Sequence, residues 1–275
     1  MFEWLFLNLR YLNSKLRGHG QVIYIDYPVT SRPRHDFGSK QLTTLIEKDR
    51  AVYAEKLQEF QAFFEQIKEF KNPQTSPNFK DSIYYPNADA LALYSMIRLY
   101  QPKRYFEVGS GSSTHFARKA VTDAKLSTAI CCVDPFPRRE IADVADKLIY
   151  QRLEDVDLSL FDQLEANDIF FFDGSHRCFT NSDVTVAFLD IIPRLKPGVI
   201  VHIHDIFLPD DYPADWNDRY YSEQYLLACY LLAETQRFQT LLPMRFILND
   251  PALSQMLAPL ELDLNGGSFW LKIGR

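Results

Sequence analysis

The chain has 275 residues, of which 47 % are hydrophobic and 24 % are charged, as in an ordinary globular protein. Its formal net charge of −6 argues against a nucleic-acid partner, because binding to phosphates requires a basic face. No apolar run approaches the about 18 residues that a membrane span needs. The four cysteines form no CxxC pair, which indicates reduced thiols in a cytoplasmic protein and favours neither a zinc site nor a disulfide framework.

The first residues predict a helix with one apolar face. This stretch carries Glu3 and lacks a small-residue cleavage site, so we expect no signal peptide. We expect the helix to dock on the protein, with contact to a membrane surface or a second subunit as the alternatives. Residues 22–29 could form a short strand. The apolar face of the helix consists of Phe2, Leu5, Leu9, Leu12 and Leu16.

A long helical pattern follows over residues 42–67, with apolar residues at spacings of three, four or seven. It ends at NPQTSPN, residues 72–78, a cluster of residues that break helices. A second helix is predicted over residues 87–100. We therefore predict that residues 1–80 are a helical extension, which covers the main domain or pairs two subunits, and that residues 81–275 are the main domain.

From residue 104 on, short apolar runs alternate with helical segments, which is typical of a parallel sheet wrapped by helices. The run 169–172 is apolar without alternation, as expected for a central strand that is buried on both faces. An apolar stripe from Val184 to Leu195 predicts a helix. The predicted strands are 104–108, 129–134, 147–151, 168–173, 199–205, 238–244 and 266–274, and a further helix spans 226–234.

The stretch RYFEVGSGSSTHFARKA, residues 104–120, predicts a strand, a glycine turn and a helix. Gly109 and Gly111 let backbone N–H groups approach a ligand that a side chain would keep away. A dinucleotide-binding turn would have glycine or alanine at the position of Thr114. This difference, together with Glu107 in the turn, indicates a cofactor other than NAD.

Acidic residues follow the next two predicted strands. In open parallel sheets a ligand lies outside the carboxyl ends of the strands. Asp134 ends the second strand, where its carboxylate can accept both hydroxyls of a ribose. Glu154 or Asp155, after the third strand, could meet an adenine amino group. Each acid alone is typical of a solvated loop, but their order at successive strand ends favours an adenosine cofactor.

Five motifs in this order resemble class I S-adenosylmethionine-dependent methyltransferases: E-V-G-S-G-S-S-T, V-D-P, E-D-V-D, F-F-D-G-S-H and L-K-P-G-V-I-V-H-I-H-D-I-F. The resemblance covers about residues 80–275. It is strongest to the branch with D-G-S-H after strand four and H-D after strand five, similar in part to sugar O-methyltransferases of antibiotic pathways. It implies an α/β fold with a doubly wound, mostly parallel, Rossmann-like sheet of seven strands.

The same resemblance implies S-adenosylmethionine as the cofactor and assigns a part of it to each motif. The glycine turn would hold the methionine end, Asp134 the ribose, and Asp155 or Glu154 the adenine. The cofactor-binding residues that we expect are Glu107, Gly109, Ser110, Gly111, Asp134, Glu154, Asp155 and Asp173.

Histidines occur at the ends of strands four and five. In a pleated strand His202 and His204 share one face, while Asp205 points the other way. We expect His202 to be a satisfied core histidine, and His204 to reach the crevice together with His176. Either His176 or His204 could take the proton of an acceptor hydroxyl, because imidazole titrates near neutral pH.

Asp173 and Asp205 also occupy positions where metal-dependent O-methyltransferases, by the same resemblance, place carboxylates for a divalent ion. Oxygen ligands suit Mg²⁺ or Ca²⁺. The chain departs from that pattern at Ile206, where relatives often have a further oxygen or amide ligand. Metal dependence, with Mg²⁺ as the ion, therefore stays open at this point.

We predict an S-adenosylmethionine-dependent methyltransferase that methylates a hydroxyl oxygen of a small molecule or a sugar. An aromatic loop with Trp216, Tyr220 and Tyr221 would line the acceptor site, or else pack beneath a long loop. One alternative is an NAD(P)-dependent oxidoreductase, against which Thr114 counts. The other is an interaction module that keeps the fold without catalysis, against which the intact glycines and strand-end acids count. The N-terminal helices could pair subunits into a homo-oligomer.

Overall fold

The computed structural model describes residues 40–82, 84–233 and 236–274. The described residues all belong to one compact unit. The predicted N-terminal helix and the predicted strand over 22–29 lie outside the described residues. Over the part of the chain that is described, no helix combines the length and the apolar character needed to cross a membrane.

The elements alternate along the chain as the sequence predicts from residue 104 on. The helices are α2 (Lys40–Glu47), α3 (Arg50–Phe60), α4 (Phe64–Glu69), α5 (Asn87–Tyr100), α6 (Ser112–Asp123), α7 (Asp183–Thr185), α8 (Glu223–Ala233), α9 (Met244–Asn249) and α10 (Pro251–Gln255). The strands are β1 (Arg104–Val108), β2 (Ala129–Val133), β3 (Lys147–Ile149), β4 (Ile169–Phe172), β5 (Ile200–Ile203), β6 (Phe238–Pro243) and β7 (Phe269–Ile273).

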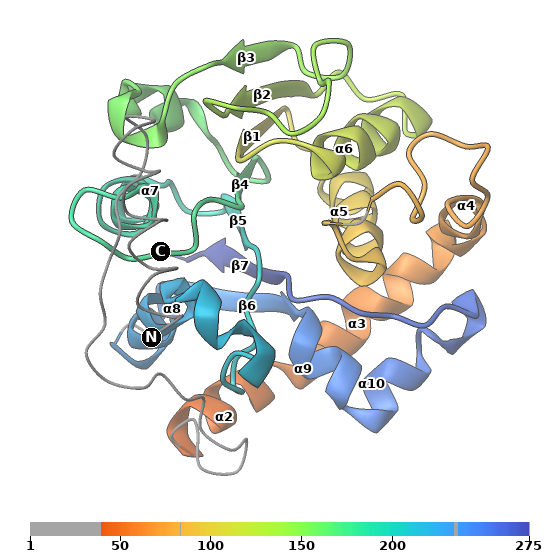
Figure 1. Ribbon diagram of the computed structural model, residues 1–275. Helices are drawn as coiled ribbons and strands as arrows, with labels where there is room; N and C mark the ends of the chain where they lie inside the picture. Colours follow the sequence, from red (N-terminus) through yellow and green to blue (C-terminus); the bar gives the residue numbers. More distant parts are fainter. Residues whose placement is uncertain (1–39, 83, 234–235, 275) are drawn as a thin grey trace, which may run out of the picture. The chain divides into compact units, whose positions relative to one another are not determined.

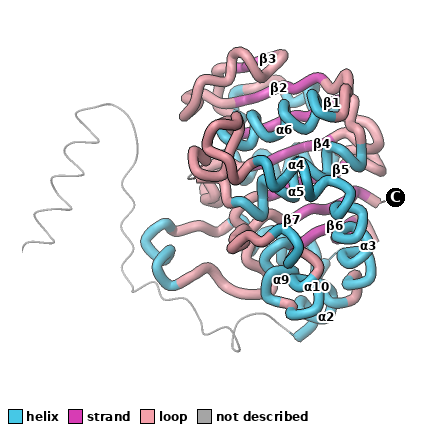
Figure 2. Tube along the Cα trace, turned by 90° about the vertical axis from the view of Figure 1, so that its right-hand side faces the viewer, coloured by secondary structure: helices cyan, strands magenta, loops and turns pink. Residues whose placement is uncertain are grey.

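The seven strands form one sheet in the order β3-β2-β1-β4-β5-β7-β6, which Figure 2 shows from top to bottom. The pairs from β3 to β5 are parallel, and β7 is antiparallel to both β5 and β6. This confirms the predicted α/β fold with a mostly parallel seven-stranded sheet. The chain runs outward from β1 to β3 and then returns to β4, so the strand order reverses between β1 and β4. Ligand crevices of open sheets lie at such a point.

Helices cover both faces of the sheet: α5 and α6 lie on one face, and α7 and α8 on the other (Figure 1). The helix over 87–100 is confirmed with the predicted bounds. The long pattern over 42–67 is divided into α2, α3 and α4, since the first helix ends at Glu47 and the next begins at Arg50. The segment after β4 is also less regular than predicted, because α7 continues as a π-helical stretch over Val186–Ile191.

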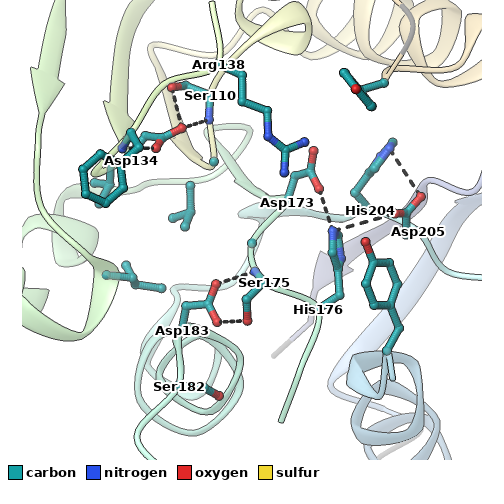
Figure 3. A pocket seen from close by; sticks show the side chains of 18 of the residues that line it. Ser110, Asp134, Arg138, Asp173, Ser175, His176, Ser182, Asp183, His204 and Asp205 are labelled. Carbon is teal, nitrogen blue, oxygen red and sulfur yellow. Dashed lines mark hydrogen bonds and ion pairs between the residues drawn. The ribbon is translucent and has the colours of Figure 1, made fainter. Parts of the chain in front are cut away.

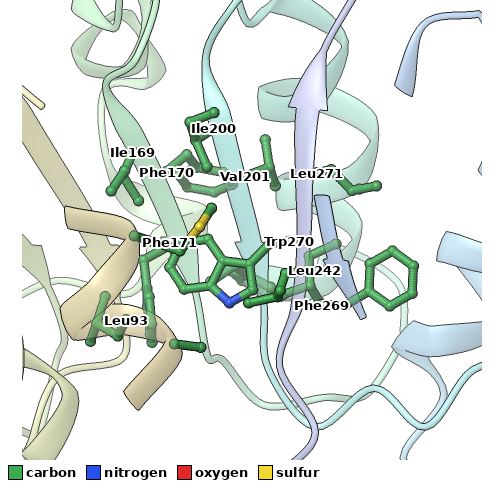
Figure 4. Packing of buried hydrophobic residues seen from close by; sticks show 14 of the residues in the cluster. Leu93, Ile169, Phe170, Phe171, Ile200, Val201, Leu242, Phe269, Trp270 and Leu271 are labelled. Carbon is green, nitrogen blue, oxygen red and sulfur yellow. The ribbon is translucent and has the colours of Figure 1, made fainter. Parts of the chain in front are cut away.

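The core contains His202, as the sequence predicts. His202 of β5 lies between Phe171 of β4 and Trp270 of β7, both of which Figure 4 shows in the buried cluster. The His202 ring lies 3.9 Å from the Phe171 ring and parallel to it. Burial is the main cause that holds the pKa of His202 well below its usual value. His202 is thus a core residue, but neither ring nitrogen has a hydrogen-bond partner among the described residues, so the expectation of a satisfied histidine is wrong.

Candidate cofactor and catalytic site

A cavity of about 620 Å³ opens at the carboxyl ends of β1, β2, β4 and β5 (Figure 3). Its volume lies within the range of small-molecule sites, about 300–1,000 Å³. A second cavity of about 300 Å³ lies over the glycine turn, includes Gly111, and shares part of its wall with the first. The predicted site residues that line the larger cavity are Gly109, Ser110, Asp134, Glu154, Asp173, His176, His204 and Asp205.

The glycine turn passes tightly against the end of β4. Gly109 has φ +79°, and a Cβ built on it would lie 1.9 Å from the Asp173 carbonyl oxygen. Only glycine permits both the backbone angle and this approach. A Cβ on Gly111 would instead meet nothing within 4 Å. The turn is therefore packed on one side and open to the cavities on the other.

Glu107 lies beneath the turn and is fully buried. Its carboxylate accepts hydrogen bonds from the Ser113 and Thr114 hydroxyls, and the Thr114 hydroxyl in turn accepts one from the Gly111 N–H at 3.1 Å. Burial is the largest influence and raises the pKa of Glu107 to about 8, although these hydrogen bonds act against it. Glu107 thus fastens the turn to α6 from inside, and Thr114, where a dinucleotide-binding turn has a small residue, supplies a link in this network.

Asp134 joins the end of β2 to the glycine turn. Its Oδ2 accepts from the Ser110 N–H at 2.7 Å and from the Ser110 hydroxyl at 2.9 Å, and its Oδ1 accepts from the Phe136 N–H at 2.8 Å. A carboxylate has about four lone-pair sites, so Asp134 can still accept hydrogen bonds from a ligand in the cavity. Asp134 therefore lines the cavity with free acceptor sites, and its contact with a ribose stays a prediction.

The two adenine candidates after β3 are placed differently. Glu154 lines the cavity. Asp155 is exposed and accepts two hydrogen bonds from the Arg152 guanidinium, at 2.8 and 2.9 Å. Of the two acids, the geometry therefore favours Glu154 as the one that faces a ligand.

His176 lies among three carboxylates. Its Nδ1 is 2.5 Å from Oε1 of Glu223, and its Nε2 is 3.3 Å from Oδ1 of Asp173 and 3.7 Å from Oδ2 of Asp205. Figure 3 shows His176 between the two aspartates. Burial alone would lower the pKa of His176, but Glu223 and Asp173 outweigh it and hold the pKa well above its usual value. These carboxylates therefore favour the protonated form of the imidazole.

Glu223 is a site residue that the sequence does not reveal. It is the first residue of α8, it is fully buried, and it is 47 residues from His176 along the chain. An acidic residue in the first turn of a helix usually has a local explanation, namely the helix dipole. Only the packing of α8 against the end of β4 shows that this carboxylate faces the histidine.

The backbone is unusual where β4 and β5 end. His176 has φ +63° and Asp205 has φ +54°, values that are uncommon outside glycine. Each such residue costs about 1–3 kcal/mol, and such residues cluster at functional sites. The turn before His176 is held by Asp183, which accepts from the Ser175 N–H and hydroxyl at 2.6 and 2.5 Å. The D-G-S-H motif is thus held by Asp183 at Ser175 and by Glu223 at His176.

His204 lines the cavity but is more enclosed than His176. It is 2 % exposed, and its ring stacks on Tyr85 at 5.2 Å. Its Nε2 is 3.7 Å from Asp205 and 4.0 Å from the buried Asp89. Burial opposes protonation, but Asp173, Asp205 and Asp89 together raise the pKa of His204. The three carboxylates therefore favour the protonated form of this ring.

The same carboxylates fit a divalent ion poorly. Among the described residues, no group of three or more His, Cys, Asp and Glu side chains is arranged to hold a metal ion. Nε2 of His176 lies near both Asp173 and Asp205, and the neighbouring Ile206 offers no ligand atom and is buried. The arrangement suits a protonated imidazole beside two carboxylates better than Mg²⁺.

An aromatic wall faces His176 from the loop before α8. Tyr221 stacks on the His176 ring at 4.3 Å, and both Tyr221 and Trp216 line the cavity. Tyr220, the third predicted aromatic residue, is 47 % exposed. Several other lining residues had no signal in the sequence, because they come from loops that only the fold brings together: Tyr84, Arg138, Arg152, Ser182, Asp183, Arg219 and Asn265.

Comparison with known proteins agrees with this geometry over the centre of the chain. Residues 106–206 match the family model described as "Methyltransferase domain". A protein of Archaeoglobus fulgidus, described only as uncharacterized, is 37 % identical over 114 residues, which cover 36 % of this chain and 51 % of that protein. The chain therefore aligns with about half the length of this curated relative.

Solved structures with a general likeness include the SAH-bound methyltransferase PaMTH1 of Podospora anserina. It is 15 % identical, with a TM-score of 0.43, over 93 % of this chain and 100 % of that one. Another is the apo structure of CmcI-N160, at 16 % identity and a TM-score of 0.44 over 96 % of this chain and 95 % of that one. These values are too low for any transfer of residue roles.

The family match includes the glycine turn, Asp134 and the ends of β4 and β5, which together form most of the cavity. It favours a methyltransferase over the NAD(P)-dependent alternative. The glycine turn agrees with this, because it has Thr114 where a dinucleotide-binding turn has glycine or alanine. Residues 106–206 are therefore similar to a methyltransferase domain.

Proposed function

We propose that the protein transfers a methyl group from S-adenosylmethionine to a hydroxyl oxygen of a small molecule or a sugar, with His176 as the base. The observation that carries this proposal is that His176, held by Glu223, lines the same cavity as the glycine turn and Asp134. When bound, S-adenosylmethionine supplies an electrophilic methyl group on its sulfonium.

The cofactor half of the cavity offers contacts along its whole length. Glu154 stands where an adenine amino group could donate, and Asp134 stands where ribose hydroxyls could donate. The backbone of Gly109 and Ser110 can approach the rest of the cofactor closely, because the turn presents no large side chain there. The Asp173 carboxylate, at the end of β4, complements the positive charges of the cofactor.

The acceptor half provides a base and a means of orienting it. In its neutral form, Nε2 of His176 takes the proton of the acceptor hydroxyl, while the Nδ1–H donates to Glu223 and keeps the ring in place. Such a base contributes about 10²–10⁴-fold in rate. Tyr221 and Trp216 would orient the acceptor. In favourable cases such orientation lowers the activation barrier by about 7–11 kcal/mol. In this proposal His204 is not the base; its Nε2 lies 3.7 Å from Asp205, which it can stabilise when it is protonated.

A small-molecule acceptor, a cytoplasmic location and pairing of subunits through the N-terminal helices belong to the same proposal. The cavity, of a volume that suits a small molecule, and the four free cysteines among the described residues support these parts of the proposal. The N-terminal helix itself lies outside those residues.

Calorimetric titration tests the cofactor. S-adenosylmethionine should bind, and NAD and NADP should not. Asp134→Ala removes a charged acceptor whose hydrogen bonds are worth about 1.5–3 kcal/mol, so binding of S-adenosylmethionine should weaken by about tenfold or more. Asp134→Asn is the matched control, since it keeps the size of the side chain and part of its bonds to Ser110.

A labelled methyl group tests the reaction. The protein should transfer the label from S-adenosylmethionine to at least one compound in a panel of sugars and phenols, and His176→Ala should reduce this transfer by about 10²–10⁴-fold. Binding of NAD in place of S-adenosylmethionine, or full transfer by a folded His176→Ala variant, would contradict the proposal.

A further inference from the structure

Arg219 is a cation on the acceptor side of the larger cavity. It ends the short helical turn Ala214–Arg219 in the loop before α8, and it lines the cavity together with Trp216 and Tyr221. It does not line the smaller cavity over the glycine turn. Since Arg219 is also exposed, it lies where the larger cavity opens to solvent. Neither the contacts proposed for the cofactor nor the proposed base uses this charge.

Three hydrogen bonds fasten the loop of Arg219 to the segment that contains the proposed base. The Arg177 Nε–H donates to the Arg219 carbonyl at 2.8 Å. The Ser222 N–H donates to the His176 carbonyl at 2.8 Å, and the Cys178 N–H donates to the Ser222 hydroxyl at 2.9 Å. The backbone of Arg219 is thus placed by its neighbours, and its own guanidinium is not needed for that purpose.

The guanidinium of Arg219 has aromatic neighbours and no acidic one. Its central carbon lies 3.8 Å from the centre of the Trp216 ring. Among the described residues, no carboxylate lies within ion-pair distance of it. By contrast Arg152, another arginine of the cavity, is engaged by Asp155. A guanidinium that stacks on an aromatic ring keeps the N–H donors in its plane available for a further partner.

Tyr221 limits the distance between this charge and the proposed base. The Tyr221 ring lies 5.8 Å from the central carbon of the Arg219 guanidinium and 4.3 Å from the His176 ring. The guanidinium and the imidazole therefore cannot be farther apart than these two distances together. One small molecule can contact both groups at once, with a different substituent at each.

A free guanidinium beside aromatic faces suits an anion that is attached to a ring. Arginine binds carboxylate and phosphate groups through paired, charge-assisted hydrogen bonds, which are stronger than neutral ones. The aspartates nearby have partners of their own: Asp183 accepts from Ser175, and Asp173 and Asp205 face the His176 imidazole. These partners reduce the repulsion that the aspartates exert on an anion.

We propose that the methyl acceptor is a small hydroxyl compound that carries a carboxylate or a phosphate group, and that Arg219 binds this anionic group while the hydroxyl faces His176. This inference rests on the proposed function and narrows it, because it assigns a charge to the acceptor. The acceptor oxygen forms its bond to the methyl carbon as the bond of that carbon to sulfur breaks, and the hydroxyl proton passes to Nε2 of His176. The anionic group takes no part in this step and fixes the position of the hydroxyl.

The test uses pairs of acceptors that differ in charge. Transfer of a labelled methyl group is measured for meta-hydroxybenzoate against meta-hydroxybenzamide, and for pyridoxine phosphate against pyridoxine. The unsubstituted protein should use at least one of the two anions with a kcat/KM about tenfold or more above that of its neutral partner, as expected for one charged hydrogen-bonding pair. The pair that shows the preference tells a carboxylate acceptor from a phosphate acceptor.

Replacement of the arginine tests the residue. Arg219→Gln should raise KM for the preferred anion by about tenfold or more. It should leave kcat, the kinetics of the neutral partner and the calorimetric affinity for SAH unchanged. Arg194→Gln is the matched control: it removes the same charge from an arginine that pairs with Asp162 and lines neither cavity, and it should alter none of these values.

Three results would overturn the inference. The first is equal use of the anionic and neutral compounds, or transfer to neutral compounds alone. The second is an unchanged KM for the anion in Arg219→Gln. The third is an equal loss for both members of a pair or a loss of SAH affinity, which would mean that Arg219 supports the loop or the cofactor. If no compound of the whole panel accepts the label, the proposed function itself fails and the inference falls with it, a result that differs from the other three.

Discussion

At the scale of single residues, the site depends on how His176 is surrounded. The imidazole has Glu223 on one nitrogen and two aspartates near the other, and Tyr221 covers its face. A histidine with so many acidic neighbours holds its proton tightly. Its neutral form is then a stronger base than free imidazole. At neutral pH, however, a smaller fraction of His176 than of free imidazole is in this neutral form.

This balance predicts the pH dependence of turnover. Because the pKa of His176 is raised, kcat for an accepted hydroxyl compound should increase as the pH rises above neutral. Glu223→Gln removes the carboxylate that raises the pKa most, so the rising limb of the profile should move to lower pH. His204→Gln serves as the comparison and should move the limb less. Profiles that coincide for the unsubstituted protein and Glu223→Gln would rule out His176 as the base.

The same surroundings predict the response to chelators. Since the protonated His176 lies near Asp173 and Asp205, we expect the pair of aspartates to need no divalent ion for charge balance. Turnover should therefore be the same with and without an excess of EDTA. A loss of turnover that added Mg²⁺ restores would show that the two aspartates bind a metal after all.

At the scale of the elements, the strands could be predicted well and the site only in part. The runs 104–108 and 169–172 are short, apolar and buried, so their pattern shows them directly. The acids that line the cavity after β2, β3 and β4 were found because they follow strands in the sequence. Glu223 and Arg138 were not, because their positions depend on how α8 and the segment after β2 pack.

The start of α6 leads to a prediction about stability. In the folded protein Glu107 keeps its proton up to about pH 8, whereas its ordinary pKa is 4.5. Its contribution to the free energy of unfolding is therefore fully present below pH 4.5 and is lost as the pH rises toward 8. Glu107→Gln cannot ionise and should gain stability relative to the unsubstituted protein over this range, by up to about 1.4 kcal/mol for each pH unit.

Chemical denaturation at about pH 5, 6, 7 and 8 would measure the difference in the free energy of unfolding between Glu107→Gln and the unsubstituted protein. The matched control is Glu65→Gln, whose side chain is 83 % exposed and which should show no such trend. A constant difference between Glu107→Gln and the unsubstituted protein at every pH would mean that Glu107 is ionised beneath the turn.

At the scale of the whole molecule, the sheet order brings distant parts of the chain to one cavity. β1 and β4 are neighbours although 60 residues separate the end of one from the start of the other in the chain, and the cavity lies where their carboxyl ends meet. Loops after β2 and β3 reach it from one side, and the loop before α8 reaches it from the other. The cofactor and the acceptor would therefore enter different halves of one space. The predicted division at residue 80 stays a proposal.

The central claim is that one cavity holds the cofactor at Asp134 and presents its sulfur to His176. A crystal structure of the protein with SAH tests this most directly. We expect the ribose hydroxyls within hydrogen-bond distance of Asp134, about 2.5–3.0 Å, and the sulfur in the half of the cavity lined by His176 and Tyr221. SAH bound elsewhere on the protein, or bound with its sulfur directed away from His176, would contradict the account.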